Sequence, residues 1–576
     1  MMDNINELFE LWLEKTKNDE ELQTELQAIK GKDGEIADRF YRYLEFGTAG
    51  LRGVLGAGTN RMNIYTVNQV TQGLADFLNH TYTEPAVAIA YDSRINSELF
   101  ARESAGVLAA NGITVYIFPE LVPTPMLSFA VRRLKCRSGI IITASHNPSK
   151  YNGYKCYDPE GYQMTDEAAR RTYEYVQTVD PFEGVRRVSF EEGTALGKIR
   201  FIEPWLNEEY YEKILEQRVN PDVCGRSSLK MIYTPLNGTG NKPVREIFRR
   251  MGQKAVTVVP EQENPDGQFP TCPFPNPEIR QVFELALKMA ETGKVDLLLA
   301  TDPDCDRVGI AVFDSGEYKL LTGNEVGALL AEYILSGRNA KGSLPEKPVV
   351  IKSFVTTDLV AAIAAKYGCE TVDLLTGFKY IGEYITNLEK KGEQDRFIIA
   401  MEESYGYLVG IHARDKDAVV ASMLICEMAA YYKEQGKTLI QVLEALYREH
   451  GMYLNTVLNF AFEGESGMKK MQQLMDGLRA DAPAEIAGMP VLKLSDYETS
   501  EAVDTATGRK TAISLPRSNV LAYKLPAGSG VIVRPSGTEP KIKVYITARA
   551  ADRDSAGQLA GSIGSDMKRI LKIEEI

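Results

Sequence analysis

Three short strands, each ending in a reactive side chain, constrain the fold of this chain more than any other feature. "IIITAS" (140–145), "LLLATD" (297–302) and "FIIAME" (397–402) place apolar residues before small or neutral ones, then end in serine, aspartate or glutamate. Such runs are typical of strands that are buried on both faces of a sheet. Helical patterns such as "TVNQVTQGLADFLNH" (66–80) separate the strands, and this alternation predicts α/β layers with mostly parallel sheets.

The spacing of these strands favours three similar α/β domains, because a solenoid would repeat every few tens of residues. Each domain would present one loop at the carboxyl end of a strand, where ligands bind in such sheets. Taken singly, each loop could also be an ordinary polar turn. A fourth strand, in "GVIVRPSGTEPKIKVYI", follows a helix-rich segment and ends in an arginine-containing loop. We expect domains at 1–215, 216–323, 324–450 and 451–576, because 576 residues exceed one hydrophobic core.

Composition excludes several classes of protein. The net charge of −13 and the lack of Lys/Arg runs argue against nucleic-acid binding. The seven cysteines form no C-x-x-C pair, so neither a zinc knuckle nor a disulfide framework is indicated, and a cytoplasmic location is expected. "MMDNINELFELWLEK" reads as an amphipathic docking helix rather than a signal peptide. "DAVVASMLICEMAAYY" (417–432) is too short to cross a bilayer and predicts a buried helix, so no membrane segment is expected.

The first loop, "SHNPSKYNGYK", offers a serine hydroxyl and a lysine. Ser145 followed by His146 suggests a serine hydrolase, but the G-x-S-x-G elbow is absent and adjacent side chains rarely form a productive pair. Alternatively, the hydroxyl carries a phosphoryl group whose charge Lys155 neutralises. The Asn152-Gly153 dipeptide predicts a tight turn that brings the lysine back. A capping serine and a solvated lysine remain the structural alternative.

The second loop, "TDPDCDR", places Asp302, Asp304 and Asp306 at alternate positions of a turn. Three neighbouring carboxylates repel each other unless a hard cation neutralises them, so a magnesium loop is indicated. An EF-hand does not fit, because its sixth and twelfth positions are Arg307 and Phe313 instead of glycine and glutamate. Three ligands leave room for a substrate phosphoryl oxygen, and Arg307 adds a second cation there.

Two further loops suit sugar and phosphate binding. In "MEESYGY", alternation along an extended segment would aim Glu402 and Ser404 the same way, towards sugar hydroxyls, although acidic turns are common. "RPSGTEP" (534–540) combines a forked guanidinium, two hydroxyls and a glycine, which together predict a phosphate cradle. It lacks the glycine-lysine-serine or -threonine ending of a Walker loop.

In this order, "TASHNP", "DPDCDR", "EESYG" and "RPSGTEP", with "FGTAGLRG" near the start, resemble the α-D-phosphohexomutase superfamily over nearly the whole chain. The extended amino terminus and "FGTAGLRG" look most like the bacterial phosphoglucomutase branch, which also resembles eukaryotic phosphopentomutase-type enzymes. The resemblance implies three similar mixed α/β domains and a smaller C-terminal α+β domain around a central cleft.

The resemblance also implies roles for individual residues. Ser145 would carry the phosphoryl group and coordinate Mg²⁺ together with the three aspartates, and Lys155, Arg52 and His146 would take part in catalysis. The substrate would contact Arg307, Thr376, Gly377, Lys379, Glu402, Ser404, Arg534, Ser536, Gly537 and Thr538. Some members carry histidine where this chain has Tyr407, which leaves the general base to Lys155 or unassigned. Cys305 stands where a small residue is common, and we expect it to be structural.

The implied reaction interconverts glucose 1-phosphate and glucose 6-phosphate through phosphoserine 145, with glucose 1,6-bisphosphate as intermediate and activator. Phosphomannomutase or phosphopentomutase activity is the alternative on the same scaffold, and a non-catalytic sugar-phosphate binding protein is a distant one. The expected partners are sugar phosphates, without nucleic acid or membrane, and the expected state is a monomer or weak dimer.

Replacing Arg534 by alanine should raise the Michaelis constant for either monophosphate, because its fork is expected to hold the phosphate that does not react. The loss should be on the order of 2 to 5 kcal/mol if the ion pair is well buried. Steady-state kinetics in both directions measure it. A variant with wild-type constants would place the phosphate anchor elsewhere.

Overall fold

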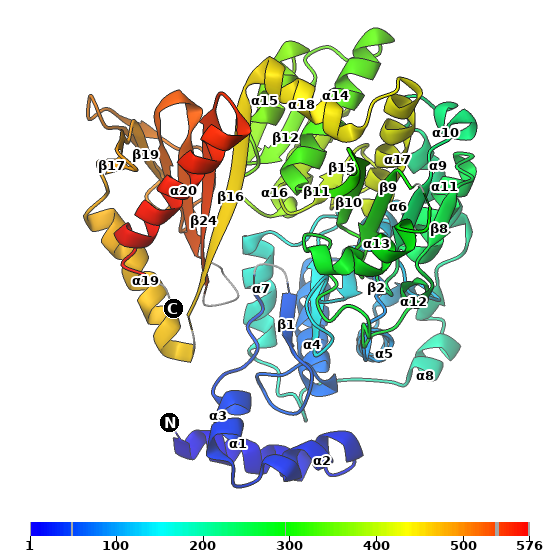
Figure 1. Ribbon diagram of the computed structural model, residues 1–576. Helices are drawn as coiled ribbons and strands as arrows, with labels where there is room; N and C mark the ends of the chain where they lie inside the picture. Colours follow the sequence, from blue (N-terminus) through cyan, green and yellow to red (C-terminus); the bar gives the residue numbers. More distant parts are fainter. Residues whose placement is uncertain (1, 48–49, 294, 463, 536–540, 574–576) are drawn as a thin grey trace. The chain divides into compact units, whose positions relative to one another are not determined.

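The chain folds into two compact units, shown in Figure 1. The first unit holds residues 1–323 and 378–438, and the second holds 324–377 and 439–576. The computed structural model describes residues 2–47, 50–293, 295–462, 464–535 and 541–573. Within these ranges, no helix has both the length and the apolar character that crossing a membrane requires.

The first sheet of the first unit has the strand order β1-β5-β4-β2-β3-β6. Its strands are β1 (Gly50–Val54), β2 (Ala86–Tyr91), β3 (Thr114–Ile117), β4 (Ser138–Ile142), β5 (Tyr151–Tyr157) and β6 (Ile199–Phe201). Strands β2, β3, β4 and β6 are parallel, whereas β5 runs antiparallel to β4 and to β1. The accompanying helices are α4 (Ile64–Thr81), α5 (Ser97–Ala110), α6 (Thr124–Arg133), α7 (Asp166–Val176), α8 (Phe190–Ala195) and α9 (Trp205–Leu215). Every residue of β4 is buried, so the strand leading to the serine loop runs through the core.

A second sheet repeats this local arrangement. Its order is β11-β10-β9-β7-β8, with β7 (Met231–Thr234), β8 (Val256–Val258), β9 (Leu297–Thr301), β10 (Val308–Asp314) and β11 (Glu317–Leu321). Strand β9 is fully buried, parallel to β7 and antiparallel to β10. The helical segments are α10 (Val223–Arg226), α11 (Asn241–Arg250), α12 (Pro260–Glu263), η1 (Arg280–Phe283) and α13 (Glu284–Ala290). The aspartate loop therefore joins a buried strand to an antiparallel partner, as the serine loop does.

The third repeat in the first unit is the hairpin of β14 (Phe397–Glu402) and β15 (Gly406–Leu408), which are antiparallel. It is accompanied by α16 (Phe378–Lys390), η2 (Gln394–Arg396) and α17 (Ala418–Glu434). The Asp417 carboxylate caps α17 by accepting the N–H groups of Val419 and Val420. Nearly all of α17 is buried, which confirms the buried helix predicted from its apolar sequence.

The second unit combines parallel strands with a larger antiparallel sheet. Strands β12 (Val349–Ser353) and β13 (Glu370–Leu374) are parallel and lie with α14 (Gly323–Ala340), α15 (Leu359–Lys366) and α18 (Leu439–His450). The antiparallel sheet comprises β16 (Met452–Ala461), β24 (Lys541–Ala550), β23 (Gly530–Pro535), β22 (Leu521–Lys524), β19 (Lys493–Asp496), β20 (Glu501–Asp504) and β21 (Lys510–Ala512). Helices α19 (Gly464–Ala480) and α20 (Arg553–Ile570) share a core with this sheet. The expected succession of α/β layers and a C-terminal α+β part is confirmed.

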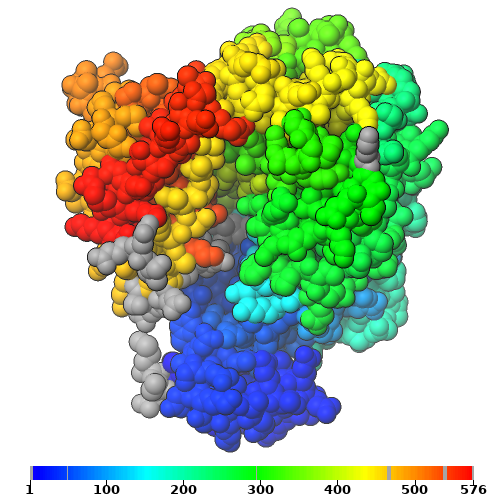
Figure 2. Space-filling model, viewed as in Figure 1, coloured from blue at the N-terminus to red at the C-terminus, as the bar shows by residue number. Residues whose placement is uncertain are grey.

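Three N-terminal helices, α1 (Met2–Lys15), α2 (Glu20–Ile29) and α3 (Asp33–Phe40), form a small core of their own. Phe40 meets the rings of Phe9 and Trp12 edge-on, each at a centroid distance of 5.9 Å. Trp12 also packs edge-on against Tyr65 of α4 and against Phe182. These dark blue residues therefore pack directly against the part of the first unit that follows them (Figure 2), as the predicted docking helix requires.

Phe40→Ala should destabilise the N-terminal helices by about 3 to 5 kcal/mol, because it opens a cavity among packed aromatic rings. The tryptophan fluorescence change during urea unfolding measures this loss, since Trp12 remains in place. Leu11→Ala is the control, because Leu11 lies on the same helical bundle but is 38% exposed. Equal unfolding midpoints for the two variants would contradict the assigned core.

Candidate active site

The loops after β4, β9 and β14 meet within the first unit. Ser145 Oγ donates to Asp302 Oδ2 at 2.9 Å, which joins the serine loop to the aspartate loop. The N–H of Val308 donates to the carbonyl of Tyr405 at 3.1 Å, which joins the aspartate loop to the third loop. Each loop also contains one residue in the left-handed region: Ser145 (φ 52°), Cys305 (φ 51°) and Tyr405 (φ 64°). Shared strain at three corresponding places points to a site that the surrounding structure holds in shape.

The three aspartates form a cluster that fits a hard cation. Asp302, Asp304 and Asp306 are buried, and one oxygen from each lies within 4.8 Å of the others. Asp304 Oδ1 and Asp306 Oδ1 are buried and have no hydrogen-bond partner among the described residues. Burial, and then the charges of Asp304 and Asp306, raise the pKa of Asp302 well above its usual value. Buried carboxylate oxygens without a hydrogen-bond donor, gathered from three aspartates, are the ligand set that a divalent oxygen-seeking ion would satisfy.

Two lysines face this cluster. Lys155 Nζ donates to Asp304 Oδ2 at 2.9 Å, and Lys416 Nζ lies 3.2 Å from Asp306 Oδ2. Burial opposes the charge on Lys416, but Asp306 and Asp415 outweigh it and raise the pKa of this ammonium. Similarly, burial disfavours the Asp304 carboxylate, but Lys155 lowers the pKa of that group below its usual value. Lys416 is therefore held in its charged form beside the aspartates.

Lys416 and Asp415 were missed by the sequence analysis. Asp415 Oδ1 accepts from Lys416 at 2.9 Å, while its other oxygen accepts from the hydroxyl of Tyr157 at 2.6 Å. The signal was available in "RDKD" (414–417), where a lysine between two aspartates directly precedes a buried helix. The partners of this lysine come from other parts of the chain, so the motif alone did not identify its role.

Strand pairing delivers Lys155 and Arg52 to the same region, and it corrects one prediction. Asn152 and Gly153 lie within β5 rather than in a tight turn; the turn comes earlier, where the Tyr151 N–H donates to the Pro148 carbonyl at 3.0 Å. Gly153 is required for close packing, because a Cβ there would lie 2.5 Å from the Thr143 carbonyl oxygen. The asparagine side chain instead bonds a neighbouring loop, so the turn signal of the dipeptide was overridden by sheet packing.

His146 and Arg52 lie beside the serine. His146 Nδ1 is 3.3 Å from Ser145 Oγ, and Arg52 Nη1 donates to Asn147 Oδ1 at 3.1 Å. Burial, followed by the charges of Arg307 and Arg52, lowers the pKa of His146 well below its usual value. The imidazole is therefore neutral at physiological pH. Cys305 is buried inside the aspartate loop, and burial raises the pKa of its thiol well above the usual value, which suits an inert structural residue.

The loop that follows β14, with Glu402 and Ser404, lies beside the cations. Glu402 is buried at the end of β14, and its charge contributes to raising the pKa of both Arg307 and Lys416. Ser404 is partly exposed in the same loop. The Tyr407 hydroxyl donates to the Gly323 carbonyl at 2.9 Å from a buried position, so this side chain is structural.

Other predicted substrate residues are distributed between the two units. Arg307 Nη1 donates to Glu278 Oε1 at 3.3 Å, and Lys379 at the start of α16 pairs with Asp166 at the start of α7, both within the first unit. Thr376, Gly377 and Arg534 belong to the second unit. Ser536, Gly537 and Thr538 lie outside the described residues.

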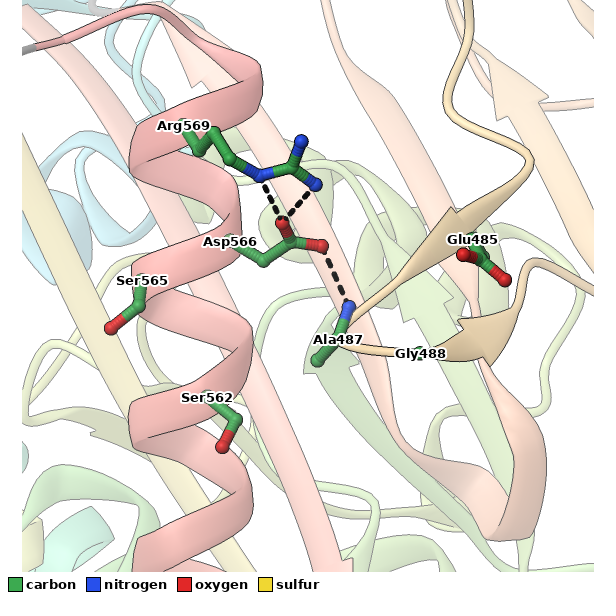
Figure 3. A pocket seen from close by; sticks show the side chains of 7 residues that line it. All are labelled: Glu485, Ala487, Gly488, Ser562, Ser565, Asp566 and Arg569. Atoms are coloured by element: carbon green, nitrogen blue, oxygen red, sulfur yellow. Dashed lines mark hydrogen bonds and ion pairs between the residues drawn. The ribbon is translucent and has the colours of Figure 1, made fainter.

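A surface hollow of about 390 Å³ lies in the second unit between α20 and the hairpin of β17 (Glu485–Ile486) and β18 (Met489–Pro490). In Figure 3 the Asp566 carboxylate accepts from the Ala487 N–H at 2.8 Å and from Arg569. The lining residues are Glu485, Ala487, Gly488, Ser562, Ser565, Asp566 and Arg569. None of the predicted site residues lines this hollow, and its central charges satisfy each other.

Comparison with known proteins identifies the family. Models of the phosphoglucomutase/phosphomannomutase α/β/α domains I, II and III match residues 43–182, 208–315 and 322–450. The C-terminal domain model of the same family matches residues 488–563. The chain belongs to the phosphoglucomutase/phosphomannomutase family. The resemblance to the α-D-phosphohexomutase superfamily is thus confirmed.

Individual relatives agree with this family. The chain is 35% identical over 554 residues to the phosphoglucomutase of Staphylococcus saprophyticus, covering 95% of this chain and 98% of that protein. It is 36% identical to the phosphoglucomutase of Staphylococcus aureus strain USA300, covering 95% and 97%. A putative phosphomannomutase from Thermus thermophilus (TM-score 0.67, 22% identity) covers 92% of this chain and 99% of its own. The open form of Paramecium parafusin, a phosphoglucomutase (TM-score 0.68, 17% identity), covers 92% and 96%. These two structures share the fold.

Asp304→Asn should weaken Mg²⁺ binding at least about tenfold, because even changes to residues around metal ligands commonly cost 10- to 100-fold. It should lower turnover far more than sugar-phosphate affinity, because the metal acts on charge that develops during transfer. Calorimetric Mg²⁺ titration and steady-state kinetics measure the two effects. Asp314→Asn is the control, since Asp314 pairs with Thr438 and Lys319 instead. Wild-type Mg²⁺ affinity in the Asp304 variant would refute the metal site.

Proposed function

We propose that this chain is a phosphoglucomutase that interconverts α-D-glucose 1-phosphate and D-glucose 6-phosphate through phosphoserine 145 and glucose 1,6-bisphosphate. The observation that carries the proposal is Ser145 Oγ, which lies 2.9 Å from Asp302 in the acidic cluster. The curated relatives named phosphoglucomutase support the choice of glucose, since they align with 95% of the chain.

In the proposed reaction, phosphoryl transfer at Ser145 takes two steps. A hydroxyl of the bound monophosphate attacks the phosphoserine and gives its proton to a base, while the Oγ–P bond breaks and the released Ser145 oxygen takes up a proton. After the bisphosphate turns round, the Ser145 hydroxyl gives its proton to a base and attacks the other phosphate, and the released sugar oxygen takes up a proton. Mg²⁺ held by Asp302, Asp304, Asp306 and the phosphoryl group on Ser145 would supply Lewis-acid stabilisation of the transferring oxygens. Lys155, already 2.9 Å from Asp304, is placed to stabilise the same charge.

Substrate positioning is assigned to the remaining predicted residues. Glu402 and Ser404 would hold sugar hydroxyls, with Thr376, Gly377 and Lys379 at the sugar and Arg307 at the reacting phosphate. Arg534, Ser536, Gly537 and Thr538 would anchor the other phosphate. Holding the sugar in line can remove roughly 7 to 11 kcal/mol of the barrier. Because the bisphosphate must turn without escaping, the anchors must accept two orientations of the sugar.

The proposal also covers the cellular location, the domain division, the oligomeric state and the partners of the chain. A cytoplasmic location suits a chain whose seven cysteines are all free and buried. We keep the four-domain division at 1–215, 216–323, 324–450 and 451–576, and a monomer or weak dimer, as predictions. Sugar phosphates are the proposed partners.

A substrate panel with catalytic glucose 1,6-bisphosphate and Mg²⁺ tests the proposal. Glucose 1-phosphate should react best, mannose 1-phosphate more slowly, and ribose 1-phosphate least, because a smaller ring leaves the Glu402 carboxylate poorly paired. A higher specificity constant for ribose 1-phosphate would instead favour a phosphopentomutase. Release of inorganic phosphate without isomer formation would favour a hydrolase.

Ser145→Ala in the same panel should nearly abolish turnover and remove a partial phosphorylation seen by peptide mass mapping. Ser149→Ala is the matched control, because this serine lies four residues further along the same loop and is partly exposed. It should keep both activity and the modification. Full mutase activity in the Ser145 variant would refute the proposed nucleophile.

A further inference from the structure

A buried arginine lies beneath the serine loop, in the turn between β2 and α5, and the proposed mechanism gives it no role. The side chains of Arg94 and Asp92 are both fully buried, and Arg94 Nε lies 3.3 Å from Asp92 Oδ2. Removing two charges from water costs more free energy than their attraction commonly returns. The Arg94–Asp92 ion pair is therefore weak evidence for a gain in folding stability. The other contacts of Arg94 indicate a role in shaping the serine loop.

Arg94 holds the backbone of the serine loop at four points. Its Nη1 donates to the carbonyls of Pro148 and Tyr151, each at 3.0 Å. Its Nη2 donates to the carbonyls of Ser145 and Asn147. A planar guanidinium suits this task because it presents several N–H groups in a fixed fork.

Arg94 and Thr143 together fix the peptide groups on both sides of the proposed nucleophile. The Ser145 carbonyl accepts a hydrogen bond from Arg94, and the Ser145 N–H donates to Thr143 Oγ1 at 2.8 Å. Between them Ser145 adopts a left-handed conformation with φ 52°, which non-glycine residues rarely adopt. In this conformation the hydroxyl reaches Asp302 at 2.9 Å.

We propose that Arg94 is a positioning residue for phosphoryl transfer: it holds Ser145 in the strained conformation that directs Oγ at the aspartate loop. This inference rests on the function proposed above for Ser145. Arg94 acts on the nucleophile through the loop backbone, and its own side chain is buried beneath that loop.

The segment between α12 and η1 covers this arginine. The Phe269 ring lies 5.0 Å from the guanidinium, as in a cation–π contact. Gly267 approaches the turn so closely that a Cβ would lie 2.5 Å from the Ile95 nitrogen. This cover comes from the part of the chain that also bears the aspartate loop, and it keeps water from the hydrogen bonds that shape the serine loop.

Arg94→Lys tests the inference, because a lysine ammonium has three donors and no fork with which to hold four carbonyls. We expect kcat to fall about 100-fold, as misplacement of reacting groups by roughly 1 Å does. The KM for glucose 1-phosphate should change less than about threefold, because the Arg94 side chain is fully buried and donates to backbone carbonyls of the loop. Hydrogen exchange in peptides covering 143–151 should accelerate in the absence of substrate.

Arg133→Lys is the matched control, because Arg133 lies in the same sheet domain but pairs with Glu209 at the surface. Both its kcat and its loop exchange should equal those of the wild type. Thr143→Val provides a second test that keeps the side-chain shape: losing the acceptor for the Ser145 N–H should lower kcat by about tenfold, again with little change in KM. This variant decides the matter if Arg94→Lys does not fold.

Wild-type kcat in both Arg94→Lys and Thr143→Val, or a loss confined to KM, would overturn the inference. The hydrogen-exchange measurement distinguishes failure of the Arg94 inference from failure of the proposed function. A wild-type protein without mutase activity would end the proposed function, whereas unchanged loop exchange in Arg94→Lys would end the positioning role whatever the activity.

Discussion

Repulsion among three buried carboxylates is the constraint on which the rest of the first unit depends. One oxygen from each of Asp302, Asp304 and Asp306 lies within 4.8 Å of the others, and nearby positive charge offsets their repulsion. Lys155 supplies it from β5 of the first sheet, and Lys416 supplies it from the segment before α17. The charges that balance the acidic cluster therefore come from chain segments far apart in sequence, which ties the cluster to the folding of the unit.

The sequence predicted the parts of this site whose signal is local. The strand ends at Ser145, Asp302 and Glu402 were visible because apolar runs lead directly into them. Lys416 and Arg94 were not identified, since their partners are distant in sequence and only the fold brings them close. The prediction of a turn at Asn152-Gly153 was wrong for a related reason: the pairing of β5 with β1 and β4 overrode the local preference of this dipeptide for a turn.

The two units carry different parts of the proposed reaction. The nucleophile, the acidic cluster and the Glu402 loop belong to the first unit, whereas Thr376 and Arg534 belong to the second. Motif order along the sequence does not reveal this division, because residues 324–377 group with the C-terminal part while 378–438 group with the N-terminal part. The four predicted domains follow the order of the motifs in the sequence, whereas the two compact units follow which segments contact each other in the fold.

The left-handed residues at Ser145, Cys305 and Tyr405 have a consequence for how such a protein can change. Each costs roughly 1 to 2 kcal/mol relative to an ordinary backbone conformation, and glycine would remove that cost. At Cys305 a glycine would leave the three aspartates in place, but at Ser145 it would delete the hydroxyl that is proposed to carry the phosphoryl group. At Ser145, a glycine that relieves backbone strain would remove the proposed chemistry, so stability and activity conflict there. At Cys305 the same relief would leave the proposed chemistry untouched, although both residues share a left-handed backbone.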